Sequence, residues 1–308
     1  YRMKIHSYNE WDQLREIYVG VATHANWPSD DPVFANESEK TLWKETPVPS
    51  GAVPGWIIDE ANEDLDALTK LLEGESVKVN RPTDLDFQEI GGMYNYCPRD
   101  RFLIAGDKIL DPAMMYPCRD LEEQCYLPML SDNTVVHMPR NKGMTLDAAN
   151  ICRLGDTWIY LESESGNRSA YDWLCDRFPH INIEKVNFYA GVHIDSTIVP
   201  LREGLVVCNQ PRIKSKDNLP PSIRNWDVIW VNDMFPQSFY EYPYASKWIG
   251  LNMLAVNSDT VIMDAAQTEL INTLEKHKFT VIPHTLRHSR TLGGGHHCVT
   301  LDTWRENA

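Results

Sequence analysis

Three glycines, two histidines and a cysteine run together near the C-terminus, from Gly293 to Cys298, and this is the first stretch whose residue types could do chemistry. Glycine permits backbone conformations that other residues avoid and lets a ligand approach closely, while residues 299–301 after the run predict a strand. Such a turn could hold Cys298 as an exposed nucleophile. A lone cysteine is more often a small buried residue, so catalysis also requires a base and a group that stabilises the thiolate.

A histidine and an aspartate two residues apart, His193 and Asp195, are candidates for those partners. Residues i and i+2 of an extended segment point to the same face. The pair could be a surface salt link. An imidazole beside a carboxylate could equally provide a catalytic base and a carboxylate that holds a cation.

Two more aspartates stand at comparable places in the sequence. Asp100 ends the segment 97–100, and Asp147 precedes two alanines and an asparagine. Asp100 could cap a turn, and a helix N-cap is the role that the sequence alone favours for Asp147. Both could instead supply carboxylates to a site.

Other chemistries fit the sequence less well. Side chains of zinc-ligand type are present at His193, Asp195, His296, His297 and Cys298, but their spacing matches no standard zinc pattern, so we expect no metal. Adjacent His-His-Cys side chains also cannot easily point at one ion. The sequence lacks the Gly-x-Ser-x-Gly motif of serine hydrolases and a phosphate-binding glycine loop, and we expect no cofactor.

Composition limits the partners. The chain has 308 residues and a formal net charge of −15. Nucleic acid and anionic membranes need a basic face, so neither is an expected partner, and a cationic small-molecule substrate is favoured. Seven scattered cysteines, with no signal peptide or long apolar run, predict a reduced cytoplasmic protein.

The elements that must position these residues follow a repeat of roughly 50 residues. Two apolar runs around a turn, typical of a hairpin, occur four times, at 101–110, 151–160, 197–207 and 254–262. A helix is expected after each hairpin, at 120–130, 169–178, 221–226 and 266–276. A strand follows each helix, at 135–137, 181–186, 228–231 and 281–282.

The N-terminal region contains a degenerate copy of this unit, with a strand at 14–20, a helix at 60–72 and a strand at 77–79. Five ββαβ modules would close into one pseudo-symmetric α/β propeller domain over residues 1–308, with a central channel where the chemical residues meet. A single open mixed sheet remains the alternative from periodicity alone. The proline-containing segment 21–56 predicts a long loop, a candidate lid.

With these residues assembled, the sequence resembles the L-arginine:amine amidinotransferases of the pentein superfamily over nearly its whole length. The resemblance rests on five segments in order: 147–149, 193–195, 209–212, 246–252 and 293–298. It implies a five-bladed α/β propeller, in agreement with the hairpin repeat. It also implies transfer of the amidino group of L-arginine to an amine, with release of ornithine.

The family's mechanism assigns a role to each chemical residue. Cys298 would attack the guanidinium carbon, and the cationic substrate would favour its thiolate. His193, oriented by Asp147, would protonate the departing ornithine amine and later accept a proton from the acceptor amine. Asp100 and Asp195 would hold the guanidinium, and the covalent intermediate implies ping-pong kinetics.

Further positions concern substrate selection. Arg212 matches a position that grips the carboxylate of arginine, and Ser246 one that binds its α-substituents, although the family's paired serines are here Ala245 and Ser246. Ala190 and Val192 stand where glycine-using members carry larger Asn and Met side chains nearby. These two residues predict an acceptor pocket for an amine other than, or bulkier than, glycine.

Two alternative functions stay open at this point. A deiminase or amidinohydrolase could use the same cysteine, histidine and aspartates, with water in place of the amine. A non-catalytic arginine-binding protein could retain the site as a remnant. The assembly is also open, with a homodimer as one candidate.

Overall fold

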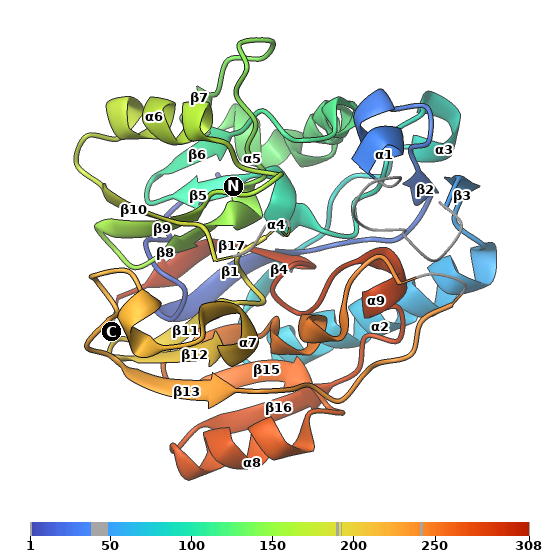
Figure 1. The fold of residues 1–308 in the computed structure, drawn as a ribbon. Helices are drawn as coiled ribbons and strands as arrows, with labels where there is room; N and C mark the ends of the chain where they lie inside the picture. The colour runs from blue at the N-terminus through green and yellow to red at the C-terminus, as the bar shows by residue number, and fades with distance from the viewer. Residues whose placement is uncertain (1, 38–48, 189–190, 192, 241–242, 308) are drawn as a thin grey trace.

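The computed structural model describes residues 2–37, 49–188, 191, 193–240 and 243–307. These residues form five three-stranded sheets and one two-stranded sheet. The five larger sheets are the blades of the predicted α/β propeller, with helices such as α6 and α8 on the outside (Figure 1). The ring, rather than the open sheet, is therefore the observed architecture.

Four blades share one topology, in which an antiparallel hairpin is followed by a strand parallel to its second member. All four predicted hairpins are confirmed. The strands are β5 (Leu103–Ala105), β6 (Lys108–Asp111) and β7 (Val135–His137); β8 (Ile151–Arg153), β9 (Thr157–Leu161) and β10 (Asn182–Val186); β11 (Ile198–Arg202), β12 (Leu205–Asn209) and β13 (Asp227–Val231); and β14 (Leu254–Asn257), β15 (Thr260–Asp264) and β16 (Thr280–His284).

The fifth blade joins the two ends of the chain. Strand β1 (Gln13–Val19) pairs antiparallel with the last strand, β17 (Thr300–Glu306), and parallel with β4 (Lys78–Asn80). Figure 1 shows β17 in red beside β1 in blue. In this blade the C-terminal strand β17 takes the place that the first hairpin strand has in the other four blades. The N-terminal unit therefore begins with β1, its second strand.

Both faces of the inner strands are buried, which explains why they are apolar runs rather than alternating patterns. Consecutive residues of β9 show how the blades pack. Trp158 belongs to a buried cluster with Leu110 of β6, whereas Ile159 belongs to one with Val206 of β12. Since side chains alternate along a strand, one strand faces both neighbouring blades.

The longer helices cover the outer edges. They are α2 (Gly55–Gly74), α6 (Arg168–Arg177) and α8 (Thr268–Lys276). The segment predicted as a helix at 120–130 is instead a 3-10 stretch, η2 (Pro117–Tyr126), followed by α5 (Leu127–Ser131). The remaining helical turns are α3 (Phe87–Ile90), α4 (Pro98–Arg101), η3 (Ala148–Asn150), α7 (Gln210–Ile213), η4 (Lys216–Asn218), η5 (Lys247–Leu251) and α9 (Ser289–Leu292).

The helix predicted at 221–226 was wrong. The segment is a series of turns, in which the amide of Ile223 donates to the carbonyl of Pro220 and that of Trp226 donates to Ile223. Pro220 and Pro221 lack amide donors, and a proline disfavours helical geometry in the residue before it. One buried apolar side chain, Ile223, is too little to hold a helix against the sheet.

The segment predicted as a long loop, 21–56, contains short regular elements among its described residues. Strands β2 (Asn26–Trp27) and β3 (Gly51–Ala52) pair, and α1 (Pro32–Glu37) lies between them in sequence. Trp27 packs on Tyr244 with ring centres 5.1 Å apart, and Phe34 packs on Tyr116 at 5.4 Å. Residues 38–48 lie outside the described residues, and a lid function stays a prediction.

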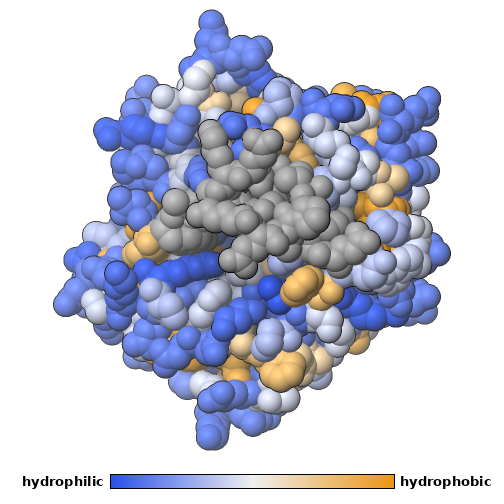
Figure 2. Space-filling view, turned by 45° about the vertical axis from the view of Figure 1, so that its right-hand side comes forward, coloured by the Kyte–Doolittle hydropathy of each residue, from blue (hydrophilic) through white to orange (hydrophobic). Residues whose placement is uncertain are grey.

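On the face shown in Figure 2, most of the described residues at the surface are hydrophilic. This agrees with the net charge of −15. Its hydrophobic patches are small. Among the described residues, no helix has the length and apolar character that crossing a membrane requires.

A buried carboxylate at the start of β17 ties several blades together. Asp302 is fully buried and accepts hydrogen bonds from Arg99 at 2.6 Å, Arg153 at 2.7 Å and Arg305. Burial alone would raise the pKa of Asp302, but these guanidinium groups hold it well below its usual range.

We predict that Asp302→Asn lowers the free energy of unfolding by about 3–5 kcal/mol, because three buried arginines lose their shared anion. Denaturant unfolding monitored by circular dichroism measures this difference. The same change at Asp259, whose side chain is 78% exposed, should leave stability nearly unchanged. Equal effects of the two substitutions would remove Asp302 from its structural role. As Asp302 has a lowered pKa, its contribution is complete above the unfolded carboxyl pKa and is lost as the pH falls below it.

Candidate active site

One pocket of about 210 Å³ collects the seven described residues that sequence analysis singled out. They come from all parts of the chain: Asp100, Asp147, His193, Asp195, Arg212, Ser246 and Cys298. Gly191 also lines it, whereas the two predicted acceptor-pocket residues, Ala190 and Val192, lie outside the described residues.

Cys298 stands at the end of a tightly packed turn. Gly293 has a φ of 82°, which favours glycine, and a side chain there would collide with the ring of Tyr244. A Cβ on Gly294 would lie 2.5 Å from the sulfur of Cys97. The turn is therefore packed too closely for larger residues. Contrary to the expectation of an exposed nucleophile, Cys298 is only 3% exposed, so its thiol is accessible only through the pocket.

The surroundings of Cys298 keep its thiol protonated. A hydrogen bond with Cys97 raises the pKa of Cys298 most, followed by burial and the negative charge of Asp195. The thiol of Cys298 donates to Oδ2 of Asp195 at 3.5 Å. A cation that neutralises the nearby carboxylates would reverse part of this effect and favour the thiolate.

His193 lies between two carboxylates. Its Nε2 is 2.9 Å from Oδ2 of Asp147, and its Nδ1 is 3.6 Å from Oδ1 of Asp100. Burial alone would lower the pKa of His193, but Asp100 and Asp147 raise it to about 9. The imidazole is therefore protonated at neutral pH and can act as a proton donor.

Asp147 is not the helix cap that the local sequence favoured. It does occupy the residue before η3, yet its side chain makes no capping bond. Its Oδ1 accepts from the amide of Met115 at 2.9 Å, and Oδ2 is directed to His193. The carboxylate is thereby fixed on both oxygens and orients the imidazole.

Asp100 is held by one oxygen and leaves the other without a hydrogen bond. Oδ2 accepts from Arg119 at 3.0 Å. Oδ1 is buried and has no hydrogen-bond partner among the described residues. Burial raises the pKa of Asp100, as expected for a carboxylate that lacks part of its compensation. An entering cation with N–H donors could provide the missing hydrogen bond.

Asp195 is an ionised carboxylate with a different environment. Burial would raise its pKa, but hydrogen bonding to His297 lowers it to about 2. The Nδ1 of His297 is 2.8 Å from Oδ2 of Asp195, and its Nε2 is 3.1 Å from Oε1 of Glu10. His297 thus bridges two carboxylates, which raise its pKa against the effect of burial.

Arg212 and Ser246 lie on the pocket wall in locally fixed positions. Arg212 belongs to α7, and its Nη1 donates to the hydroxyl of Thr197 at 2.8 Å. Ser246 caps η5 by accepting from the amide of Trp248 at 3.3 Å. Both residues line the pocket from elements other than the turn that carries Cys298.

Sequence reasoning missed three residues that shape the site, namely Asn252, His297 and Arg119. Asn252 Oδ1 accepts from the amides of His297 and Cys298, each at 2.9 Å, and its Nδ2 donates to the carbonyl of Asp195 at 3.3 Å. Asn252 ends one segment that carried the resemblance and His297 lies within another, which was the available signal. No local pattern pointed to Arg119.

The arrangement suits reaction with a flat cation. Two buried carboxylates can hold N–H groups of the cation, a thiol lies beside one of them, and an imidazolium can deliver a proton. Among the described residues, no group of three or more His, Cys, Asp or Glu side chains could hold a metal ion.

Comparisons with known proteins identify the family of the chain. No family model matches the chain. The inosamine-phosphate amidinotransferase 1 of Streptomyces griseus is 37% identical, with 97% of this chain and 96% of the relative covered. The L-arginine:L-lysine amidinotransferase of Pseudomonas savastanoi pv. phaseolicola is 28% identical, with 97% and 94% covered.

A solved structure of the Streptomyces griseus inosamine-phosphate amidinotransferase is also similar. It superposes with a TM-score of 0.92 at 34% identity, covering 100% of this chain and 98% of that one. The agreement extends over the whole ring and includes every blade that contributes to the pocket. The chain therefore belongs to the amidinotransferase family of the pentein superfamily.

Proposed function

We propose that this amidinotransferase takes the amidino group from L-arginine, carries it as a covalent amidino-cysteine on Cys298 and transfers it to an amine. The observation that carries the proposal is the pocket itself, where the partly buried imidazole of His193 lies with one buried thiol and two buried carboxylates. Such an excess of buried acidic groups needs a cation to complete it, and guanidinium offers N–H donors on its whole edge.

L-arginine, the amidino donor, contacts both ends of the pocket. The guanidinium lies between the ionised Asp195 and Asp100, whose Oδ1 has no hydrogen-bond partner in the described part of the chain. The carboxylate of arginine is directed to Arg212, and its α-substituents to Ser246. Binding places the guanidinium carbon near Cys298 and brings positive charge to the thiol, which lowers its pKa.

The first half-reaction forms the enzyme intermediate. The thiol of Cys298 loses its proton to solvent as the cation binds. Its sulfur then bonds to the guanidinium carbon, and the bond from that carbon to the side-chain nitrogen of arginine breaks. His193 gives its proton to this nitrogen, so ornithine departs as a neutral amine or after a further protonation by solvent. Asp147 keeps the imidazole aligned during the transfer.

The second half-reaction reverses the roles. An acceptor amine enters the vacated pocket and bonds to the amidino carbon, while the carbon–sulfur bond breaks and Cys298 leaves as a thiolate. His193, now neutral, accepts a proton from the amine. The products are a guanidino compound and the starting enzyme, and the kinetics are ping-pong.

The acceptor is an amine bulkier than glycine. The small Ala190 and Val192 in the sequence support this choice. By name, the 37% identical relative acts on an inosamine phosphate and the 28% identical one on L-lysine. An aminocyclitol phosphate is therefore the first acceptor to assay.

We predict that L-arginine and a suitable amine yield ornithine and a guanidino product, and that arginine alone yields a mass gain of one amidino group on Cys298. Cys298→Ala should abolish both results, since no other group supplies the bond to carbon. Liquid chromatography with mass spectrometry of products and protein measures them. Citrulline and ammonia as the main products would instead indicate a hydrolase, and transfer by Cys298→Ala would contradict the covalent step.

We predict that Asp195→Asn weakens arginine binding by about 2–5 kcal/mol, because the buried guanidinium loses a charge partner. Calorimetry in the Cys298→Ala background measures the dissociation constant without turnover. Asp156→Asn, at an exposed turn, is the matched control. An unchanged dissociation constant would remove Asp195 from the donor clamp.

We predict that kcat/KM for arginine rises with pH, with an apparent pKa of about 9. Below this pH the free enzyme has His193 protonated and Cys298 as a thiol, and the reactive imidazolium–thiolate form carries one proton fewer. Asp147→Asn lowers the pKa of His193, so the rise should move to lower pH and the maximum should fall. Asp107→Asn, at an exposed turn, should leave the profile in place. A decline through the same range would contradict this assignment.

A further inference from the structure

A groove with a positive lining adjoins the candidate active site. Its volume is about 410 Å³, against about 210 Å³ for the pocket that holds Cys298. The groove is formed by the end of β10 with residues 187–188, by α7, and by the turns that follow it up to residue 224. Arg212 lines both cavities. The chain segment that leaves the groove at Phe188 continues to Gly191 and His193 of the pocket.

The charge of the groove is opposite to that of the chain. Its described lining residues include four basic side chains, Lys185, Arg212, Lys214 and Arg224, and no acidic one. The whole chain carries 44 Asp and Glu against 29 Lys and Arg. A local excess of positive charge, on a chain whose net charge is negative, favours binding of an anion at this groove.

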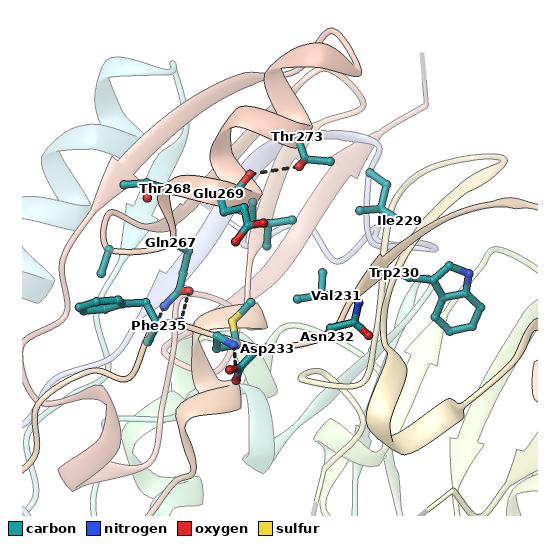
Figure 3. Close-up of a pocket in the computed structure, with 13 residues that line it drawn as sticks. Ile229, Trp230, Val231, Asn232, Asp233, Phe235, Gln267, Thr268, Glu269 and Thr273 are labelled. Atoms are coloured by element: carbon teal, nitrogen blue, oxygen red, sulfur yellow. Dashed lines mark hydrogen bonds between the residues drawn. The ribbon is translucent and has the colours of Figure 1, made fainter.

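Another cavity of about 410 Å³ provides a contrast. It lies between β13 and α8 and is drawn in Figure 3. Its lining includes the carboxylates of Asp233 and Glu269 and, among the described residues, no Lys or Arg. Among the described residues, the cavity between β13 and α8 thus does not share the positive lining of the groove.

The basic groups of the groove differ in how far they are neutralised. Lys185 pairs with Glu162 at 3.1 Å. Arg224 donates to the carbonyl of Leu219 at 3.1 Å and 2.8 Å, which fixes the guanidinium without cancelling its charge. Lys214 is exposed and follows α7 directly. Arg224 and Lys214 thus contribute positive charge to the groove.

Glu184, the carboxylate on β10 next to the groove, forms hydrogen bonds with Ser222. Glu184 accepts from the hydroxyl of Ser222 at 2.5 Å and from its backbone amide at 3.1 Å. It is not among the residues that line the groove. These bonds hold the turn that carries Arg224 against β10.

We propose that this groove binds a phosphate monoester on the acceptor, while the acceptor's amine reaches Cys298. The inference rests on the proposed amidino transfer, because ping-pong kinetics require donor and acceptor to use the same pocket in turn. Arg212 meets the carboxylate of arginine and then the anion of the acceptor. The carboxylate of arginine can pair with Arg212 alone. A phosphate dianion has three acceptor oxygens and more negative charge, so it can also contact Lys214 and Arg224.

The experiment compares an aminocyclitol phosphate with the same aminocyclitol lacking phosphate. In Lys214→Glu and Arg224→Glu, KM for the phosphorylated acceptor should rise roughly tenfold, while KM for the unphosphorylated one changes much less. Lys216→Glu is the control, because Lys216 is exposed nearby and does not line the groove. Inorganic phosphate should inhibit competitively against the phosphorylated acceptor, and more weakly in the two groove variants.

Several outcomes would overturn the proposal. One is an equal effect of all three variants, which would indicate a general electrostatic effect. Another is an equal effect on both acceptors, and a third is no effect at all. Formation of amidino-Cys298 from arginine alone, followed by mass spectrometry, tests the donor half-reaction separately. If that adduct is absent in the unaltered protein, the proposed function fails. Titration of inorganic phosphate followed by phosphorus NMR still tests the groove in that case, and loss of binding in the groove variants alone would support it.

Discussion

The ring and the site both depend on the hydrogen-bonded ion pairs that the buried carboxylate of Asp302 forms. It binds Arg99, Arg153 and Arg305, and so connects the closing strand β17 with the segment before β5 and with β8. Arg99 also donates to the carbonyl of His297 at 3.2 Å, and its amide donates to the carbonyl of Cys298. Since Asp100 is the next residue, the same contacts that close the ring set the carboxylate of Asp100 relative to the thiol.

The pocket is electrostatically incomplete without a ligand. Asp195 is ionised, and one oxygen of Asp100 has no hydrogen-bond partner among the described residues. The pKa of Cys298 is raised by its hydrogen bond with Cys97, by burial and by the negative charge of these carboxylates. A guanidinium would compensate the carboxylates and favour the thiolate at the same time. Guanidinium binding and thiolate formation would then occur together. In the free enzyme, Cys298 would stay in its less reactive thiol form. Beyond Arg212, the groove reverses the sign of the lining, so a ligand with a cationic end and an anionic end has only one favourable orientation.

Local patterns predicted most of the fold, and each failure has a physical cause. The four hairpins and the strands at 135–137, 181–186, 228–231 and 281–282 could be predicted because apolar runs bounded by turns report buried strands directly. The helix at 221–226 failed because Pro220 and Pro221 remove amide donors, and tertiary contacts replace it with turns. The segment 21–56 looked structureless because its short elements, such as α1, are stabilised by aromatic packing on distant residues and not by their own periodicity.

The sequence by itself determined the order of the modules and pointed to seven of the residues that line the pocket, since residue types, spacing and apolar runs are properties of short segments. Tertiary structure decided between the two roles open to Asp147, whose side chain contacts His193 and makes no capping bond. It alone decided that Cys97 contacts Cys298 and that His297 joins Asp195 to Glu10. His297 and Glu10 are 287 residues apart. A side chain's periodicity reports the face it lies on but not its partner, which is fixed only when the last strand pairs with the first and the ring closes.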